Sequence, residues 1–369
     1  MSREDEHRPP SRPVLAMSSL GQIGRFGNQI LQYAALRILA KRSGARVECP
    51  NWDGRRLFGL NDPEVRSQLT PAIETWERGE SLFHRVPELV AYIESISGKS
   101  SIRVGVEALE QGVVDVDLWG HFQWHMRHFA GDQEFLRSLF DPVDAIRPSL
   151  DEAVGRLRAR GRTIVGIHLR RADFGNLPLL GFTFATPFQW WREWLEKVWN
   201  DYDDPVLLVC SDDLRGLDRE FQRFSPVTSP DLGVSLPAGW NGMEYYPDFH
   251  LLSQCDVVGI SNSTFSFAAA LLNRRARQFA RAHWDPARRI IPFDPWDSPP
   301  LLYVGNECPR VFKRFGEALR IEYDTQGTSG VVKCLLNYPV ASTKIRFKRL
   351  SLAFQAGGSA AAMRSLLRF

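Results

Sequence analysis

The sequence predicts an α/β protein in which buried strands alternate with amphipathic helices. Two apolar runs, TIVGIHL at 163–169 and PVLLVCS at 205–211, are typical of strands in a parallel sheet that helices cover on both faces. The chain also opens with an apolar run, a glycine-bearing turn and a helical pattern, which is the order of a βαβ unit. At 369 residues and 44% hydrophobic residues, it is long enough for two such domains.

The first half contains the opening βαβ unit and a region that is harder to divide into elements. Residues 14–20 are apolar, the turn GQIGRFGNQ follows, and QILQYAALRILAKRSG has helical spacing that ends at Gly44. ARVEC then predicts a second strand. Between 60 and 110 helical patterns alternate with turn residues, whereas 132–140 and 149–160 predict helices.

The second half repeats the α/β rhythm more regularly. After the strand at 163–169, PFQWWREWLEKVWN predicts a helix opening at Pro187, and the strand at 205–211 follows. DFHLLSQC, DVVGIS, TFSFAAALLNR and ARQFARA then predict helix, strand, helix and strand. Several polar motifs lie at the carboxyl ends of these strands, where ligands bind in open α/β sheets.

Charge and composition exclude some classes of function. Charged residues make up 24% of the chain, which is typical of a folded globular protein, and a net charge of +3 does not predict a nucleic-acid partner. The charge is uneven, because no acidic residue follows Asp324 while seven Lys and Arg residues do. This basic tail predicts either peripheral contact with an anionic membrane surface or a solvated, partly disordered segment.

The cysteines and the N-terminus predict a cytoplasmic setting. Five scattered cysteines without CxxC spacing indicate neither a disulfide framework nor a zinc site, so a reducing compartment fits. The first residues lack the apolar stretch of a signal peptide, and no apolar run is long enough to span a membrane. Contact with the inner face of a membrane through the tail is the alternative.

The strongest chemical motif is His168-Leu169-Arg170-Arg171-Ala172-Asp173, which follows the strand at 163–169. The planar guanidinium group of arginine can donate two parallel hydrogen bonds to phosphate oxygens. Two adjacent arginines at a strand end therefore predict an anion site. The alternative is a structural ion pair between arginine and Asp173 at a domain edge.

Ser211-Asp212-Asp213 follows the strand at 205–211. It predicts a helix cap or, as in transferases with a DxD motif, a metal site. Metal is disfavoured because Arg170 and Arg171 could supply the positive charge.

Two turns add backbone donors to the predicted site. Ser261-Asn262-Ser263-Thr264-Phe265-Ser266 lies between a strand and a helix, where free N–H groups and hydroxyls predict an anion site or a capping run. GRFGNQ, which contains Gly27 and Asn28, resembles a dinucleotide turn but lacks the G-x-G-x-x-G spacing.

Taken together, the motifs resemble the α-1,2-fucosyltransferase family, a glycosyltransferase family 11-like group. GRFGNQILQYAALRILA is similar to its opening segment, and HLRRADF is similar to the His-x-Arg-Arg-x-Asp motif shared by several fucosyltransferases. YYPDFHLLSQCDVVGISNSTFSFAAALLN at 245–273 resembles its longest motif, and ARQFARAHWDP the segment that follows. The likeness covers roughly residues 20–50 and 160–285.

The resemblance implies a GT-B-like fold, with two Rossmann-like domains facing a cleft. The sequence pattern, with a connection at DPVDAIRP, predicts a disordered leader at 1–13, a first domain at 14–155, a second at 156–300 and an extension with the basic tail at 301–369. With the resemblance, the first is expected to bind the acceptor and the second the GDP-sugar donor. The resemblance further implies an inverting transfer of fucose from GDP-fucose to a glycan hydroxyl, α-1,2 to galactose, with no metal and no other cofactor. The acceptor would be an oligosaccharide or a lipid-linked glycan.

The resemblance also implies roles for individual residues. Arg170 and Arg171 would hold the β-phosphate and stabilise the departing GDP, and Asp173 completes this catalytic motif. Asp248 would accept hydrogen bonds from guanine. The remaining residues expected to bind the donor or order its loop are Gly27, Asn28, His168, Asp212, Asp213, Ser263, Thr264 and Phe265.

Two departures from the family pattern leave the general base unassigned. Ala172 stands where the family usually has glycine, and Pro178 stands where the α-1,6 branch has its candidate base. Glu244 is a candidate only because it lies near Asp248 in the sequence. The alternatives are a transferase for another GDP-sugar or a catalytically silent glycan- or nucleotide-binding protein. The intact arginine and SNSTFS motifs argue against the silent protein.

Overall fold

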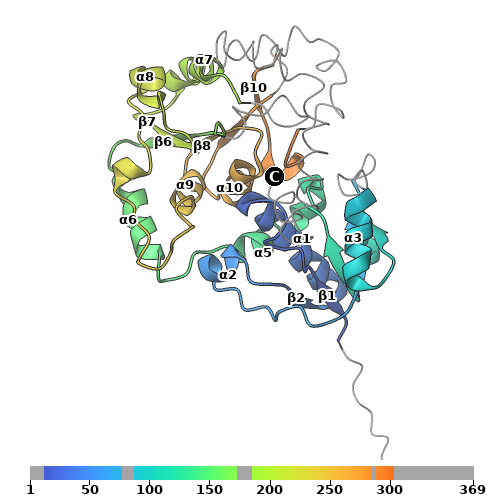
Figure 1. The fold of residues 1–369 in the computed structure, drawn as a ribbon. Helices are drawn as coiled ribbons and strands as arrows, with labels where there is room; N and C mark the ends of the chain where they lie inside the picture. Colours follow the sequence, from blue (N-terminus) through green and yellow to red (C-terminus); the bar gives the residue numbers. More distant parts are fainter. Residues whose placement is uncertain (1–11, 77–86, 173–184, 284–287, 303–369) are drawn as a thin grey trace, which may run out of the picture.

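The computed structural model describes residues 12–76, 87–172, 185–283 and 288–302. Most of the predicted leader at 1–13, nearly all of the extension at 301–369, Asp173 and Pro178 lie outside these ranges. In the described part the chain forms two α/β units, each built on its own sheet (Figure 1). The predicted α/β class with two largely parallel sheets is therefore confirmed.

The first sheet has the strand order β2-β1-β5-β3-β4, and its strand pairs are parallel. Its strands are β1 (Val14–Ala16), β2 (Arg46–Glu48), β3 (Thr70–Glu74), β4 (Ile102–Val104) and β5 (Val116–Trp119). Its helices are α1 (Phe26–Ser43), α2 (Asp53–Phe58), α3 (Pro87–Ser97) and α4 (Ala108–Gln111). The predicted opening βαβ unit is confirmed, with a first strand shorter than the apolar run at 14–20.

The second sheet has the order β10-β9-β8-β6-β7, with only the edge pair β10–β9 antiparallel among the described pairs. Its strands are β6 (Thr163–Leu169), β7 (Pro205–Ser211), β8 (Val257–Ile260), β9 (Gln278–Ala282) and β10 (Ile290–Pro292). Its helices are α7 (Phe188–Val198), α8 (Leu217–Phe221), α9 (Tyr246–Leu252) and α10 (Thr264–Leu272). The predicted strands at 163–169 and 205–211 have these same bounds because both are buried apolar runs.

The two units are joined through a short helical connection. It comprises the 3-10 helix η1 (Met126–Asp132), α5 (Gln133–Ser138) and α6 (Arg147–Arg158). Helix α6 packs against β6 and α9 of the second unit, and the sequence-based division at 155/156 falls inside it. The short 3-10 helices of the second half are η2 (Trp199–Asp201), η3 (Gln222–Phe224), η4 (Pro230–Leu232) and η5 (Pro295–Asp297).

Helix α1 is the central element of the structure because it is buried along most of its length. It ends at Gly44, whose φ of 69° is the left-handed conformation that favours glycine at a helix C-terminus. Lys41 and Arg42 in its last turn complement the negative end of the helix dipole. Its first turn packs against α10, so one helix of the first sheet contacts the second unit directly (Figure 1).

Gly27 permits this contact between the helices. A Cβ at position 27 would overlap backbone atoms of Thr264 and Phe265 in the first turn of α10. Around this point aromatic side chains from both units pack together, with ring centroids of Phe26 4.9 Å from Tyr245 and 5.0 Å from Phe249. The absence of a side chain at Gly27 therefore sets how closely the two units approach.

We expect Gly27→Ala to destabilise the fold, because the added methyl group meets backbone rather than a movable side chain. Overpacking of this kind typically costs about 1–3 kcal/mol. Gly155→Ala is the matched control, since Gly155 is exposed within α6 and a Cβ there meets nothing within 4 Å. That control should raise stability by about 0.4–1 kcal/mol. Thermal unfolding of both variants measures the difference, and equal melting temperatures would contradict the packing role.

Candidate functional site

Ser261 joins the carboxyl ends of β6 and β8. This fully buried side chain donates a hydrogen bond to the carbonyl of His168 at 2.5 Å and accepts one from the backbone N–H of Arg170 at 2.9 Å. The hydroxyl of Ser261 therefore orders the HLRR strand end instead of facing a ligand. The sequence placed it in an anion-binding or capping run, whereas the structure gives it this bridging position.

Asp212 holds the loop that follows β6. Its Oδ1 accepts hydrogen bonds from the backbone N–H groups of Arg171 at 2.7 Å and Ala172 at 3.1 Å. Its Oδ2 forms an ion pair with the Arg170 guanidinium at 2.9 Å, and both side chains are largely buried. The arginine–aspartate pair considered for this motif thus exists between Arg170 and Asp212. Asp173 lies outside the described residues.

Arg171 is left with unused donors. Its guanidinium carbon lies 3.8 Å from the centre of the Phe188 ring, which gives a cation–π contact. Its Nε and one Nη are enclosed and have no hydrogen-bond partner within the described part of the chain. Burial lowers the pKa of Arg171, and the nearby Asp213 and Asp212 oppose that shift. A guanidinium remains charged in proteins, so this one is suited to meet an anion.

Asp213 is bound by its own neighbour in the sequence. Arg215, an exposed side chain, donates to both carboxylate oxygens at 2.8 and 2.6 Å. These bonds lower the pKa of Asp213 to about 2. Neither aspartate caps a helix, because α8 begins only at Leu217, after Gly216.

The first turn of α10 brings backbone donors to the same sheet edge. Ser263 occupies the N-cap position, yet its hydroxyl makes no capping hydrogen bond. Thr264 and Phe265 begin the helix, whose N-terminus carries the positive end of the dipole. Asn262 differs from its neighbours, because it is fully buried and bonds to both backbone groups of Leu302. Asn262 therefore has a structural position.

His168 and Asp248 lie near this edge in buried surroundings. The His168 ring lies 5.2 Å from that of Phe265, and its Nδ1 has no partner among the described residues. Burial, with a smaller effect of Arg170, lowers the pKa of His168 to about 3, so the ring is neutral at pH 7. Burial raises the pKa of Asp248 to about 6, against the opposing bonds from Ser229 and the backbone of Ser211.

The remaining predicted residues lie at the edge of the site or outside it. Gly27 packs on α10, and Asn28 accepts a hydrogen bond from Gln123 at 2.7 Å. Glu244 is exposed and accepts a hydrogen bond from the backbone of Gly242 at 2.9 Å. That bond lowers the pKa of Glu244, which weakens it as a base.

Sequence reasoning missed a buried carboxylate at the carboxyl edge of the first sheet. Glu74 ends β3, is fully buried and accepts backbone hydrogen bonds from His121 at 2.7 Å and Gln123 at 3.0 Å. Burial raises its pKa to about 7. Glu74 thereby shapes the turn after β5 that contacts Asn28. In the sequence, Glu74 is a single acidic residue at the end of the short apolar run TPAI, which gives little signal.

The site can therefore bind an anion next to a polar ring. The structure brings together three strand ends of the second sheet, carried by His168, Arg170, Arg171, Asp212, Asp213, Ser263, Thr264 and Phe265. Positive charge, helix N–H groups and an unpartnered arginine gather there, whereas the aspartates are already hydrogen-bonded. No group of three His, Cys, Asp or Glu side chains in the described ranges is placed to hold a metal.

Comparison with known proteins agrees with these motifs. The family model described as Glycosyl transferase family 11 matches residues 115–284. Galactoside alpha-(1,2)-fucosyltransferase 1 of Saimiri boliviensis boliviensis is 29% identical over 262 residues, which cover 68% of this chain and 63% of that protein. The protein of the same name from Alouatta caraya is 28% identical over 263 residues, with the same coverage. The predicted resemblance is confirmed, and the chain spans about 63% of the length of these relatives.

Solved structures of fucosyltransferases are similar over most of the chain at low sequence identity. NodZ alpha-1,6-fucosyltransferase soaked with GDP-fucose has a TM-score of 0.45 at 14% identity, covering 77% of this chain and 99% of that chain. A mutant of Arabidopsis thaliana FUT1 in complex with GDP has a TM-score of 0.44 at 12% identity, covering 83% and 82%.

We expect Asp248→Asn to stabilise the protein at neutral pH. The folded pKa of about 6 lies above the ordinary value near 3.9, so the protonated carboxyl favours folding at low pH. That contribution is lost as pH rises through 6, where the buried carboxylate ionises. The variant should therefore gain about 1–3 kcal/mol relative to the wild type between pH 4 and 7. Urea unfolding at several pH values measures this gain.

Asp144→Asn is the control for this pH series, because the Asp144 side chain is fully exposed. Its stability difference from the wild type should stay flat over the same range. A flat difference for Asp248→Asn as well would contradict the raised pKa.

Proposed function

We propose that this protein is a glycosyltransferase that moves fucose from GDP-fucose to a hydroxyl of a glycan acceptor, α-1,2 to galactose. One observation carries the proposal: Arg171 presents buried, unpartnered guanidinium donors at the carboxyl edge of the second sheet, where ligands bind in open α/β sheets. The relatives' names supply the sugar and the linkage. Incubation with GDP-fucose and GDP-mannose, followed by measurement of GDP release with and without oligosaccharides, tests the donor and the reaction.

In this proposal the diphosphate lies between Arg171 and the first turn of α10. The guanidinium supplies in-plane donors, and the helix N-terminus supplies backbone N–H groups and a positive dipole. Asp212 holds the backbone of the arginine loop, so the charges are in place before the donor binds. Pre-arranged donors stabilise developing charge without a cost of reorganisation during the reaction.

Guanine recognition is assigned to Asp248. Its carboxylate can accept two hydrogen bonds from guanine N1–H and N2–H, a pattern that adenine does not present. The pKa of about 6 leaves this group mostly ionised at pH 7, and guanine donors would favour the ionised form further. His168, neutral and with a free Nδ1 in the described structure, is placed to contact the base or the ribose.

The proposed chemistry is a displacement with inversion. The acceptor oxygen bonds to the anomeric carbon of fucose while the bond from that carbon to the β-phosphate oxygen breaks, and GDP leaves with the electron pair. Arg170 and Arg171 stabilise the negative charge on the leaving group. The acceptor proton passes to a departing phosphate oxygen or to a carboxylate that remains unassigned, because Glu244 is bound to its own turn.

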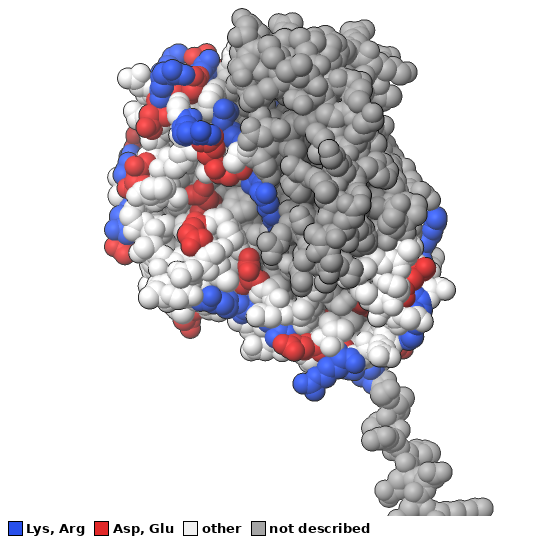
Figure 2. Space-filling view, viewed as in Figure 1, with Lys and Arg blue, Asp and Glu red and all other residues white. Residues whose placement is uncertain are grey.

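We also propose a cytoplasmic location and a contact between the basic tail and an anionic membrane. The segment KIRFKRLSLAF at 344–354 lies outside the described residues. On the described part of the face in Figure 2, Lys and Arg lie interspersed with Asp and Glu. Within the described ranges, no helix has the length and apolarity needed to cross a bilayer. Sedimentation with anionic vesicles, with and without residues 344–369, tests the tail.

Arg171→Ala should abolish transfer while leaving the fold intact. Loss of a positioned donor to a leaving group typically costs about 2.7–4 kcal/mol of transition-state stabilisation. Arg171→Lys should recover only part of the rate, because lysine lacks the planar fork. Arg223→Ala, on an exposed side chain paired with Glu196, is the control and should keep full activity. If Arg171→Ala retained more than about a tenth of the rate, a loss near 1.4 kcal/mol, the assignment would be wrong.

Transfer should survive removal of divalent metal, because arginines and a helix N-terminus supply the positive field. Asp212 and Asp213 support this expectation, since their oxygens already accept hydrogen bonds from backbone N–H groups and guanidinium groups. The measurement is the initial rate of GDP release before and after treatment with EDTA. A rate that falls with EDTA and returns with Mn²⁺ or Mg²⁺ would place a metal at the two aspartates.

A further inference from the structure

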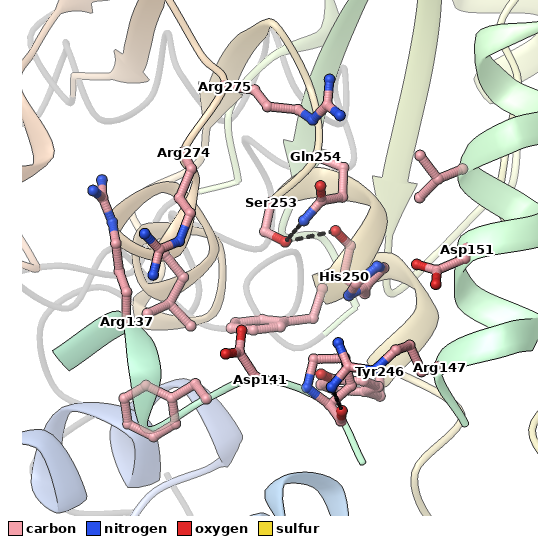
Figure 3. Close-up of a pocket in the computed structure, with 15 residues that line it drawn as sticks. Arg137, Asp141, Arg147, Asp151, Tyr246, His250, Ser253, Gln254, Arg274 and Arg275 are labelled. Carbon is pink, nitrogen blue, oxygen red and sulfur yellow. Dashed lines mark hydrogen bonds between the residues drawn. The ribbon is translucent and has the colours of Figure 1, made fainter. Parts of the chain in front are cut away.

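A cavity lies beside the helices α9 and α10, which also carry residues of the candidate site. It has a volume of about 350 Å³ and is lined by the end of α5, the chain to α6, α6 itself, α9 and the last turn of α10 (Figure 3). Its lining residues include none of those predicted to bind the donor, although Asp248 lies between the lining residues Tyr246 and Phe249 in α9. The cavity is therefore separate from the proposed donor site.

Aromatic side chains form one wall of this cavity. Phe140, Tyr246 and Phe249 line it, and each of these residues is at most 5% exposed, so their positions are set by the core. The rings of Tyr246 and Phe249 lie 5.9 Å apart and nearly parallel. These side chains are almost fully covered by the core, so they give the cavity a fixed apolar wall rather than an open stacking surface.

His250 is the buried polar side chain of the cavity. It is 8% exposed, and its ring nitrogens make no hydrogen bond to any described residue. Burial is the main cause that lowers the pKa of His250 to about 4, so the ring is neutral at pH 7 and offers one donor and one acceptor. In Figure 3 its ring extends toward Asp151 on α6. The imidazole can therefore bond to a ligand that enters the cavity.

The charged groups around His250 are of both signs and incompletely paired. Within the described residues, neither Asp141 nor Asp151 has an ion-pair partner, and Arg275 has none either. Arg137 is already used, because it donates to the carbonyls of Leu271 and Asn273. An anionic ligand would meet the aspartates, and a cationic ligand would meet the arginines. A neutral ligand rich in hydroxyl groups can donate to the aspartates and accept from the arginines and the imidazole.

We propose that this cavity binds a neutral saccharide ring, at a site separate from the one proposed for the GDP-sugar. The sugar would lie beside the apolar wall, and its hydroxyls would bond to His250 and Asp151. The volume lies within the usual range of small-ligand pockets. This inference rests on the cavity itself and does not require the proposed transferase activity.

Histidine side-chain NMR separates the two sites in one experiment. The chain has eight histidines, of which His168 reports on the candidate donor site and His250 on the cavity. Full-length protein with labelled histidine would be titrated separately with lactose, galactose 6-phosphate, spermidine and GDP. We expect lactose to shift the His250 signals saturably, and GDP to shift those of His168 while leaving His250 unchanged.

Asp151→Asn tests the contact residues without disturbing the core, because Asp151 is exposed on α6. Its affinity for lactose should fall about tenfold or more, as expected for loss of a hydrogen bond to a charged group. Glu152→Gln is the matched control, since Glu152 neighbours Asp151 on the same helix but pairs with Arg156. It should bind lactose like the wild type. His250→Gln serves as a second variant and identifies the His250 signals.

The outcomes distinguish this site from the proposed function. Lactose binding that shifts His250 and weakens in Asp151→Asn supports the saccharide site, whether or not GDP shifts His168. No saturable shift of His250 with lactose overturns the proposal, as does an affinity that Asp151→Asn leaves unchanged. A shift of His250 with galactose 6-phosphate or spermidine alone would show an ion site and would also overturn it.

Discussion

The close approach of α1 and α10 at Gly27 is the constraint on which the rest of the structure depends. It is a backbone-to-backbone contact, so a small side chain cannot be accommodated by rotation of a neighbour. The contact joins the two sheets and places the first turns of both helices side by side. Two helix N-termini that meet in this way create a region of positive potential without any charged side chain. Aromatic residues, including Phe26 and Phe265, pack around this contact.

The charges of the candidate site are divided between structure and binding. Asp212 uses both oxygens to fix the loop and to pair Arg170, and Asp213 is paired with Arg215. Arg171 is thereby left as the charge whose donors have no partner in the described structure, and its contact with Phe188 orients it. A site of this kind is suited to an anion, because the guanidinium is already desolvated in the folded protein.

Helices α9 and α10 contribute residues both to the candidate site and to the cavity. Asp248 and His250 lie two residues apart on α9. Asp248 is half-buried and His250 is buried, and the pKa values of both are moved toward the neutral form. A short helix is a rigid element, so a ligand held at either place would restrain the same backbone. The geometry thus offers a direct physical connection between the two places.

Much of the architecture could be predicted from the sequence, because hydrophobic periodicity is a local property. The runs at 163–169 and 205–211 form strands with the predicted bounds, α1 ends at Gly44 as its pattern indicated, and the polar motifs do lie at strand ends. The elements between 60 and 110 were only weakly assigned from the sequence, because the strands there are short: β3 has 5 residues and β4 has 3. Local pattern therefore determined the fold class, the order of elements and the edge of the sheet that carries the candidate site.

Only the tertiary structure decided which polar groups meet, because pairing depends on contacts between residues far apart in the chain. The sequence could not show that Asp212 would hold the Arg170 loop, or that Ser261 would bridge two strand ends. Gly27 was predicted from a turn motif, whereas its closest contact is with another helix. The cavity at His250 likewise arises where α6, α9 and α10 pack together. Composition and spacing determine which side chains are available, and packing determines which of them remain unpaired.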